Sequence, residues 1–112
     1  MRTVHFENCE VSVHGSPWAL FLYRREFKKD WYEDYQEATG FIESTGYFDQ
    51  LFLLQTCWAL AKTLDKDLPP FEEWANSLEA NMAIEAPWTG EVMSEVLSEL
   101  FRVPVEEQEE TQ

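Results

Sequence analysis

The sequence has few basic residues. Lysine and arginine number 8 against 22 aspartates and glutamates, which gives a formal net charge of −14 in 112 residues. Such a chain repels nucleic-acid phosphates and anionic lipid surfaces, so we expect it to bind neither nucleic acid nor a membrane. The charge suits solubility, a basic partner, or mimicry of a polyanion. Twelve of the acids but a single basic residue lie between Asp67 and Gln112, so the excess is concentrated in the last third.

Cysteine and long apolar runs are also scarce. The two cysteines, Cys9 and Cys57, stand far apart, and a chain of this length can form a core without disulfides. The first residues lack the apolar segment of a secretory signal. No apolar run approaches the roughly 20 residues of a membrane-spanning helix. These features predict a reduced, cytoplasmic protein.

Catalytic and cofactor motifs such as GxGxxG, a Walker loop, CxxC or HExxH are absent from the sequence. The two histidines, His5 and His14, would need a third metal ligand, and only Glu7 and Glu10 are near them. Cys57 lies in an apolar run without a histidine beside it, which predicts a core residue rather than a nucleophile. We therefore expect no cofactor, no metal and no enzymatic activity. An enzyme with paired carboxylates is an alternative that would need acids converging in a pocket.

The chain is rich in apolar residues, and these residues recur at regular intervals along the sequence. Hydrophobic residues make up 45% of the sequence and aromatic residues 15%, which predicts a folded protein despite the charge. Apolar and polar residues alternate through residues 3–14, which predicts a β-hairpin with one apolar face. A two-residue turn at Asn8–Cys9 would set Phe6 opposite Val11.

The rest of the chain follows helical periodicity. Ser16 caps the first predicted helix with Pro17 at its first position, Asp30 caps the second, and Gly40 ends that second helix. A central segment is apolar nearly all round, which is typical of a buried helix. Thr89 is expected to cap the last helix. The predicted helices span residues 17–29, 31–39, 47–65, 70–78 and 90–102.

These patterns predict a mainly α fold, a small helical bundle of four to five helices with an N-terminal β-hairpin. We expect residues 1–104 to form one domain. The acidic segment 105–112 is predicted to be a disordered tail.

The tryptophans are candidates for a contact surface, because five of them exceed what a small core needs. Trp18 and Trp58 fall on apolar helix stripes and are expected in the core. Trp31, Tyr35 and Trp74 lie near predicted helix starts, and we expect them to be exposed partner contacts. The alternative is that these aromatic side chains fill gaps between short helices.

Glu91, Glu95 and Glu99 repeat at four-residue intervals on the predicted outer face of the last helix. Like charges at this spacing destabilise a helix slightly. The row is therefore a candidate site for a basic partner, and the alternative is an ordinary solvated face.

A basic cluster interrupts the first two thirds of the chain, and aromatic residues flank it. Basic side chains between aromatic ones can form a nucleic-acid platform, but the net charge opposes that interpretation. The simpler interpretation is cations near a helix C-terminus. The cluster could also pair with the acidic last third, within one molecule or through self-association. Its members are Arg24, Arg25, Lys28 and Lys29.

Two stretches carry the most distinctive pattern, SPWALFLYRREFKKD at residues 16–30 and WALAK followed by DLPPFEEW at residues 58–62 and 67–74. Together they resemble the phage tail assembly chaperones of siphophages and prophages of Gram-positive bacteria, over residues 4–101. The second stretch is similar to that family's W-A-x-A-K and P-x-F-x-x-W-L segments, with Ala75 where leucine is frequent. The first is similar to a Y-R-x-E-F-G-x-D-like helix end, with Lys28 in place of the usual glycine and matches at Tyr23, Arg24, Glu26, Phe27 and Asp30.

The resemblance implies a non-enzymatic protein without catalytic residues. It implies binding and solubilising of the tape-measure protein, so that tail-tube subunits polymerise around it. A second implied partner is the tail-tube protein, engaged through a form extended by a programmed ribosomal frameshift. The implied location is the cytoplasm of the bacterial host, outside the mature virion. The rival hypothesis is an acidic DNA mimic that inhibits a host nucleic-acid-binding protein, although the acids are spread over several segments.

Overall fold

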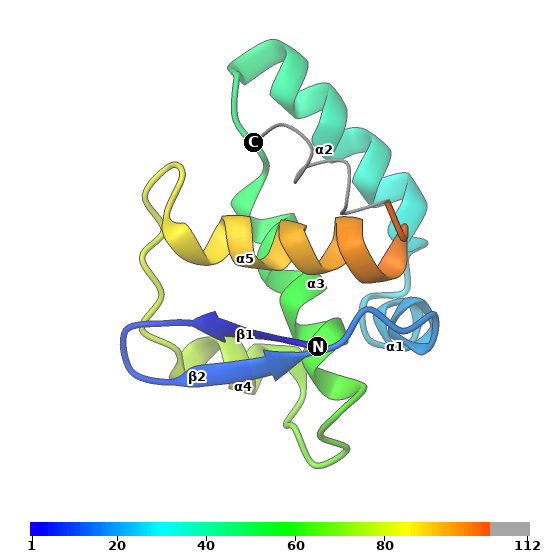
Figure 1. The fold of residues 1–112 in the computed structure, drawn as a ribbon, viewed down its shortest axis with the longest axis vertical. Helices are drawn as coiled ribbons and strands as arrows, with labels where there is room; N and C mark the ends of the chain where they lie inside the picture. The colour runs from blue at the N-terminus through cyan, green and yellow to red at the C-terminus, as the bar shows by residue number, and fades with distance from the viewer. Residues whose placement is uncertain (104–112) are drawn as a thin grey trace, which may run out of the picture.

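The computed structural model describes residues 1–103 and begins with a β-hairpin (Figure 1). Strands β1 (Arg2–His5) and β2 (Glu10–Val13) are antiparallel, with Val4 opposite Val11. The predicted hairpin is confirmed, but its predicted register is wrong by two residues. The backbone N–H of Phe6 donates to the carbonyl of Cys9 at 2.9 Å, which centres the turn on the two residues between them. An even shift leaves every side chain on its predicted face, so the apolar face of the hairpin is unchanged.

The turn lies where it does because Asn8 forms hydrogen bonds with the last residue of the fourth helix and with the segment that follows it. Its Nδ2 donates to the carbonyl of Ser77 at 2.9 Å, and its Oδ1 accepts from the N–H of Glu79 at 3.0 Å. The N–H of Glu7 also donates to the Glu79 carbonyl, at 2.9 Å. These long-range bonds have no local sequence signal, so a turn rule based on neighbouring residues could not find them.

Five α-helices and one π-helical segment follow within the described residues, so the mainly α prediction is confirmed. In Figure 1, α3 passes through the middle of the molecule, α5 crosses it, the hairpin lies along α5, and α1 lies at one edge. The elements are α1 (Trp18–Phe27), α2 (Trp31–Thr45), α3 (Gln50–Lys62), α4 (Phe71–Ser77), α5 (Pro87–Glu95) and η1 (Val96–Leu100).

Helix α2 begins as predicted but ends later. The Asp30 side chain accepts from the N–H of Glu33 at 3.2 Å, which confirms the predicted cap. The prediction that Gly40 ends the helix is wrong, because the helix continues to Thr45. Gly46 ends it in the left-handed region, with φ of 91°. A glycine inside an exposed helix costs only about 1 kcal/mol, whereas Gly46 offers a helix end that needs no strained side chain.

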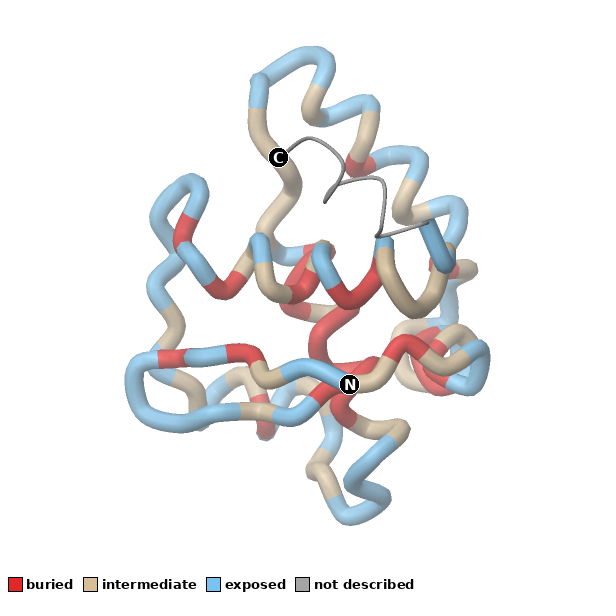
Figure 2. Tube along the Cα trace, in the orientation of Figure 1, coloured by how far each residue is buried: buried red, intermediate tan, exposed pale blue. Residues whose placement is uncertain are grey.

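Helix α3 is the buried centre of the fold, as its sequence predicted. Nine of its residues are buried, and Figure 2 shows the buried part of the chain concentrated there and on the parts of its neighbours that face it. The helix begins at Gln50 instead of Tyr47, because the Asp49 carboxylate accepts from the N–H groups of Leu51 and Phe52.

The last helix starts three residues earlier than predicted. Pro87 occupies its first turn, where a missing N–H costs nothing. Thr89, expected as the cap, lies inside the helix, and its hydroxyl donates to the carbonyl of Ala86 at 2.7 Å. At its far end α5 passes into the π-helical segment η1, a form that is rare and often found at functional sites.

Gly15 lets the chain pass close to η1. A Cβ atom added there would lie 2.8 Å from Glu99 Cβ and 2.9 Å from the backbone nitrogen of Leu100. Real Cβ atoms do not tolerate such distances, so the hairpin and η1 can pack this closely only through glycine.

The residues that carry the resemblance fasten helix ends to one another. Glu26 Oε2 accepts from the N–H of Phe71 at 2.7 Å, at the start of α4, where Pro70 offers no side-chain cap. Trp58 Nε1 donates to the Pro69 carbonyl at 2.9 Å, and Lys62 Nζ donates to the Lys66 carbonyl at 2.8 Å. The two stretches therefore hold each other in place through the connection between α3 and α4.

The predicted acidic tail, residues 105–112, lies outside the described residues. Within residues 1–103, no helix is both long and apolar enough to cross a membrane.

Candidate interaction surface

The predicted acidic row turns inward, toward the hairpin. Glu91 accepts from the N–H of His5 at 2.8 Å, and its second oxygen lies 2.9 Å from His5 Nδ1. Glu95 is fully buried, and the Cβ of Glu99 lies against Gly15. The expectation of an outer, solvated row is therefore wrong for Glu91 and Glu95, because their carboxylates pair with polar groups of residues 1–15.

Glu95 is the most enclosed of these acids and sits where α5 becomes η1. Its Oε2 accepts from the N–H of Gly15 at 2.9 Å and lies 3.9 Å from His14 Nδ1. Arg2 Nε lies 3.4 Å from its Oε1. A carboxylate removed from water without such partners would be strongly destabilising. Glu95 and these partners thus hold the hairpin against the last helix. The signal available in the sequence was the set of basic side chains near the N-terminus, Arg2, His5 and His14.

The prediction that Trp31 is exposed is also wrong. Trp31 is 2% exposed, and its Nε1 donates to the hydroxyl of the buried Thr56 at 3.0 Å. Tyr35 is half-buried and stacks on Trp31 with ring centroids 5.1 Å apart. Phe101 packs edge-on against both rings. These aromatic side chains fill the space between α2, α3 and the end of η1, as the alternative interpretation of them predicted.

Trp74 is likewise a core residue, 5% exposed, and packs edge-on against Phe6 of the hairpin with centroids 6.2 Å apart. Trp18, expected in the core, is instead 51% exposed, whereas Trp58 is buried as predicted. The buried stripe of α1 consists of Ala19, Leu22 and Tyr23. Tyr23 can be buried because its hydroxyl donates to Asp34 Oδ2 at 2.6 Å, and that partner could not be read from the helix period.

The strongest candidate for a contact surface is the outward side of α1 together with the start of α2. Phe21 is 64% exposed, Trp18 51% and Tyr32 49%, and the rings of Trp18 and Phe21 touch with centroids 5.1 Å apart. Large exposed aromatic side chains that cluster are typical of interaction sites, whereas single ones are ordinary. We call this surface the α1 face and define it as Trp18, Phe21, Arg24, Arg25, Lys28 and Tyr32.

The α1 face contains a hollow of about 230 Å³, lined by Leu20, Phe21, Arg24, Asp30 and Tyr32. Its walls are mostly apolar, and one rim carries an ion pair between Arg24 and Asp30 at 3.4 Å. Small-molecule pockets typically have roughly 300–1,000 Å³. The hollow is therefore better suited to a side chain of a partner protein than to a whole ligand.

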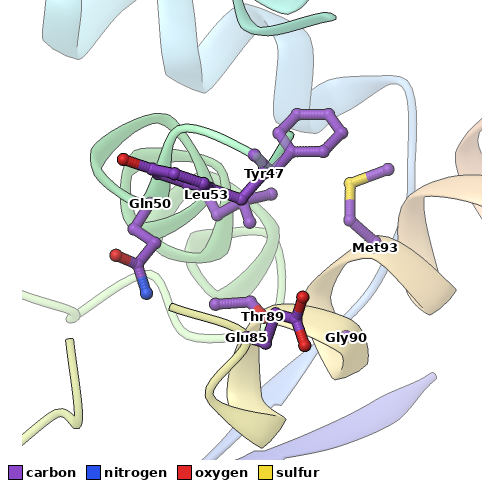
Figure 3. Close-up of a pocket in the computed structure, with 8 residues that line it drawn as sticks. Tyr47, Gln50, Leu53, Glu85, Thr89, Gly90 and Met93 are labelled. Carbon is purple, nitrogen blue, oxygen red and sulfur yellow. The ribbon is translucent and has the colours of Figure 1, made fainter. Parts of the chain in front are cut away.

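A second hollow, of about 180 Å³, lies between the start of α3 and the start of α5. Figure 3 shows Tyr47, Gln50 and Leu53 on one side and Thr89, Gly90 and Met93 on the other. Gln50 Nε2 donates to the carbonyl of Ala83 nearby. Glu85 is its one carboxylate, so the site lacks the pair of carboxylates that the alternative enzymatic hypothesis requires. The hollow is smaller than typical ligand pockets.

A third hollow, of about 480 Å³, lies beneath β2 against the end of α3 and α4. Glu10, Asp65 and Cys9 contribute its ionisable groups, and Trp74 forms part of its wall. No exposed aromatic cluster surrounds it, and its acids have no basic neighbour in the lining. It therefore offers neither the groups for a reaction nor a strong anchor for a partner.

Two buried side chains, Cys57 and Tyr23, have raised pKa values, and neither shift favours a reactive form. Burial raises the pKa of the Cys57 thiol, so the thiolate that a nucleophile requires is disfavoured. Burial, and then the hydrogen bond to Asp34, raise the pKa of Tyr23. Within residues 1–103, no three His, Cys, Asp or Glu side chains gather as metal ligands.

Comparison of the chain with protein-family models, curated proteins and solved structures gives no match. The function therefore has to be argued from the α1 face and from the two stretches of sequence described above. The sequence places Arg24, Arg25 and Lys28 among aromatic residues, but two of the aromatics predicted to be exposed, Trp31 and Trp74, are buried. The sequence signal for an exposed aromatic surface was the three-residue spacing of Trp18 and Phe21, which places them on one side of α1 together with basic residues at its C-terminal end.

Proposed function

We propose that the protein is a non-enzymatic phage tail assembly chaperone that binds and solubilises a tape-measure protein in the cytoplasm of the bacterial host. The observation that carries the proposal is the α1 face. It exposes Trp18, Phe21 and Tyr32 together, although the chain has enough core positions to bury its other four tryptophans. The resemblance of residues 16–30 and 58–74 to this chaperone family points the same way.

The physical requirement is a reversible cover for apolar helical stripes. A tape-measure protein is a long helical chain that exposes such stripes before the tail tube forms around it. An exposed aromatic surface beside a hollow can take up protruding side chains in the manner of helix-in-groove recognition. Several copies along one chain would keep it dispersed through their shared negative charge, while each copy binds weakly enough to be released.

The test is co-expression with the tape-measure protein encoded in the same genome, followed by a solubility assay and a pull-down. We expect the tape-measure protein to move from the insoluble to the soluble fraction and to co-purify with this chain. The proposal fails if the tape-measure protein stays insoluble and unbound. If a basic host nucleic-acid-binding protein co-purifies instead, the DNA-mimic alternative takes its place.

A further inference from the structure

Building on the proposed function, we infer that the α1 face recognises an amphipathic helix whose apolar stripe is bordered by acidic side chains. The inference runs against the net charge of −14, which favours a basic partner. It concerns the chemistry of the bound segment, and it rests on the charges that lie next to the exposed aromatics.

The α1 face is a locally basic part of an acidic protein. Positions three and four apart share a side of a helix, so Phe21 has Arg24 and Arg25 as its neighbours toward the helix end, and Lys28 follows in line. All three basic residues are exposed. Within residues 1–103, Arg25 and Lys28 form no ion pair, whereas Arg24 is paired with Asp30.

Three of the nearby acids are already engaged elsewhere. Asp30 caps α2 and pairs with Arg24. Glu26, on the inner side of α1, accepts from the N–H of Phe71. Asp34 accepts from the Tyr23 hydroxyl. A partner that lies on Trp18 and Phe21 therefore meets unpaired cations at the C-terminal end of α1, and acidic side chains on that partner complement them.

Screening decides whether the local or the total charge governs binding. The molecule measures 41 × 30 × 29 Å. In about 0.15 M salt the Debye length is about 8 Å, so a bound helix senses mainly the neighbouring cations. In about 0.01 M salt it is about 30 Å, and the whole acidic molecule contributes. The preference for an acidic helix should therefore grow as salt is raised over this range, which is opposite to the behaviour of a simple attraction between net charges.

Two synthetic helical peptides serve as probes. They share one leucine stripe, and they differ only in having glutamate or lysine at the positions beside it. We expect the glutamate peptide to bind about tenfold more tightly in about 0.15 M salt, as two or three exposed charge pairs would give. Fluorescence anisotropy of labelled peptides measures this ratio at both salt concentrations.

Charge reversal locates the effect. The double variant Arg25→Glu, Lys28→Glu should lose the preference for the glutamate peptide. The control variant Lys66→Glu, a single charge reversal at an exposed position after α3, should keep it. Phe21→Ser should weaken the binding of both peptides equally, because it removes the apolar anchor and leaves the basic side chains in place.

Tighter binding of the lysine peptide in about 0.15 M salt would overturn the inference, and so would a preference that survives the double reversal. Binding of single-stranded oligothymidylate in preference to the glutamate peptide, lost on the same reversal, would overturn it in favour of a nucleic-acid platform.

The co-expression assay separates this inference from the proposed function. If the peptides behave as expected and the tape-measure protein stays insoluble, the function fails and the α1 face keeps its specificity. If the tape-measure protein is solubilised but the peptide preference is absent, only the inference fails.

Discussion

At the scale of the residue, Lys28 is the clearest case of a side chain in an unfavourable backbone position. It follows α1 with φ of 60° and ψ of 30°, in the left-handed region. Glycine occupies such positions without strain, and glycine is usual at this point in the family that the first stretch resembles. The unusual lysine thus retains a cation on the α1 face at a cost in stability.

We predict that Lys28→Gly raises the free energy of unfolding by about 0.5–1 kcal/mol, because it relieves left-handed strain. The loss of a cation near the helix end offsets only about 0.3 kcal/mol of this at an exposed site. Urea unfolding measures the change. Lys29→Gly is the control, since Lys29 has no positive φ, and it should not stabilise. An equal gain in both variants would contradict the explanation.

Alkaline conditions should destabilise the fold through Cys57 and Tyr23. Their pKa values in the folded protein are raised above the ordinary 9.0 and 10.0. Above its ordinary value each group has lost its proton in the unfolded state but keeps it in the folded state, so stability falls as pH rises. The stability is fully present below about pH 9, and each group then removes up to about 1.4 kcal/mol per pH unit.

Urea unfolding at a series of pH values from about 8 to about 10.5 tests this. Cys57→Ala should flatten the decline between about pH 9 and 10, whatever its effect on stability at neutral pH. Tyr23→Phe should flatten only the part above about pH 10. A decline that is the same in Cys57→Ala and in the unchanged protein would contradict burial as its cause.

At the scale of the element, Gly40 and Gly46 decide where α2 ends. Gly40 lies inside the helix with open space around its Cα, whereas Gly46 has φ of 91°. Gly40→Ala should therefore stabilise the protein by about 1 kcal/mol, and Gly46→Ala should destabilise it by at least about 1 kcal/mol. Thermal unfolding followed by circular dichroism gives both signs. Reversed signs would mean that the helix ends at Gly40, as its sequence suggested.

The packing of the hairpin on η1 depends on Gly15. Gly15→Ala should destabilise the protein by about 1–3 kcal/mol, because its Cβ would overlap the backbone of η1 and force the two elements apart. Gly90→Ala is the matched control inside α5, with nothing near the added atom, and should stabilise by about 0.5–1 kcal/mol. Chemical denaturation distinguishes them. Equal effects at the two positions would show that the close approach at Gly15 is not needed.

The elements themselves could largely be predicted from sequence, because hydrophobic period and caps are local. Asp30 and the apolar run of α3 each specify their helix without help from the rest of the chain. What could not be predicted is which aromatic side of a short helix faces inward. Tyr23 is buried and Trp18 exposed because of the partners Asp34 and Gln55, which come from other helices. Glu95 was predicted to be exposed, and that prediction failed for the same reason, since its partners lie in and next to the N-terminal hairpin.

At the scale of the whole molecule, the acidic excess is not an even coat. Part of the predicted acidic surface holds the hairpin to the last helix through Glu91 and Glu95, and the basic cluster borders the exposed aromatics. This distribution favours one binding face on an otherwise repulsive particle. Under the proposed function, such a particle would bind its partner in one orientation, and its negative charge would keep the complex dispersed.

The measurement that tests the central claim most directly is a pull-down of the co-expressed tape-measure protein with two matched double variants. Trp18→Ser with Phe21→Ser removes the aromatic part of the α1 face. Leu51→Ser with Ile84→Ser removes two residues of similar exposure, 63% and 54%, outside that face. The account predicts that the first pair abolishes binding and solubilisation while the second pair retains both. Retained binding by the first pair, or equal loss in both pairs, would contradict the assignment of the α1 face.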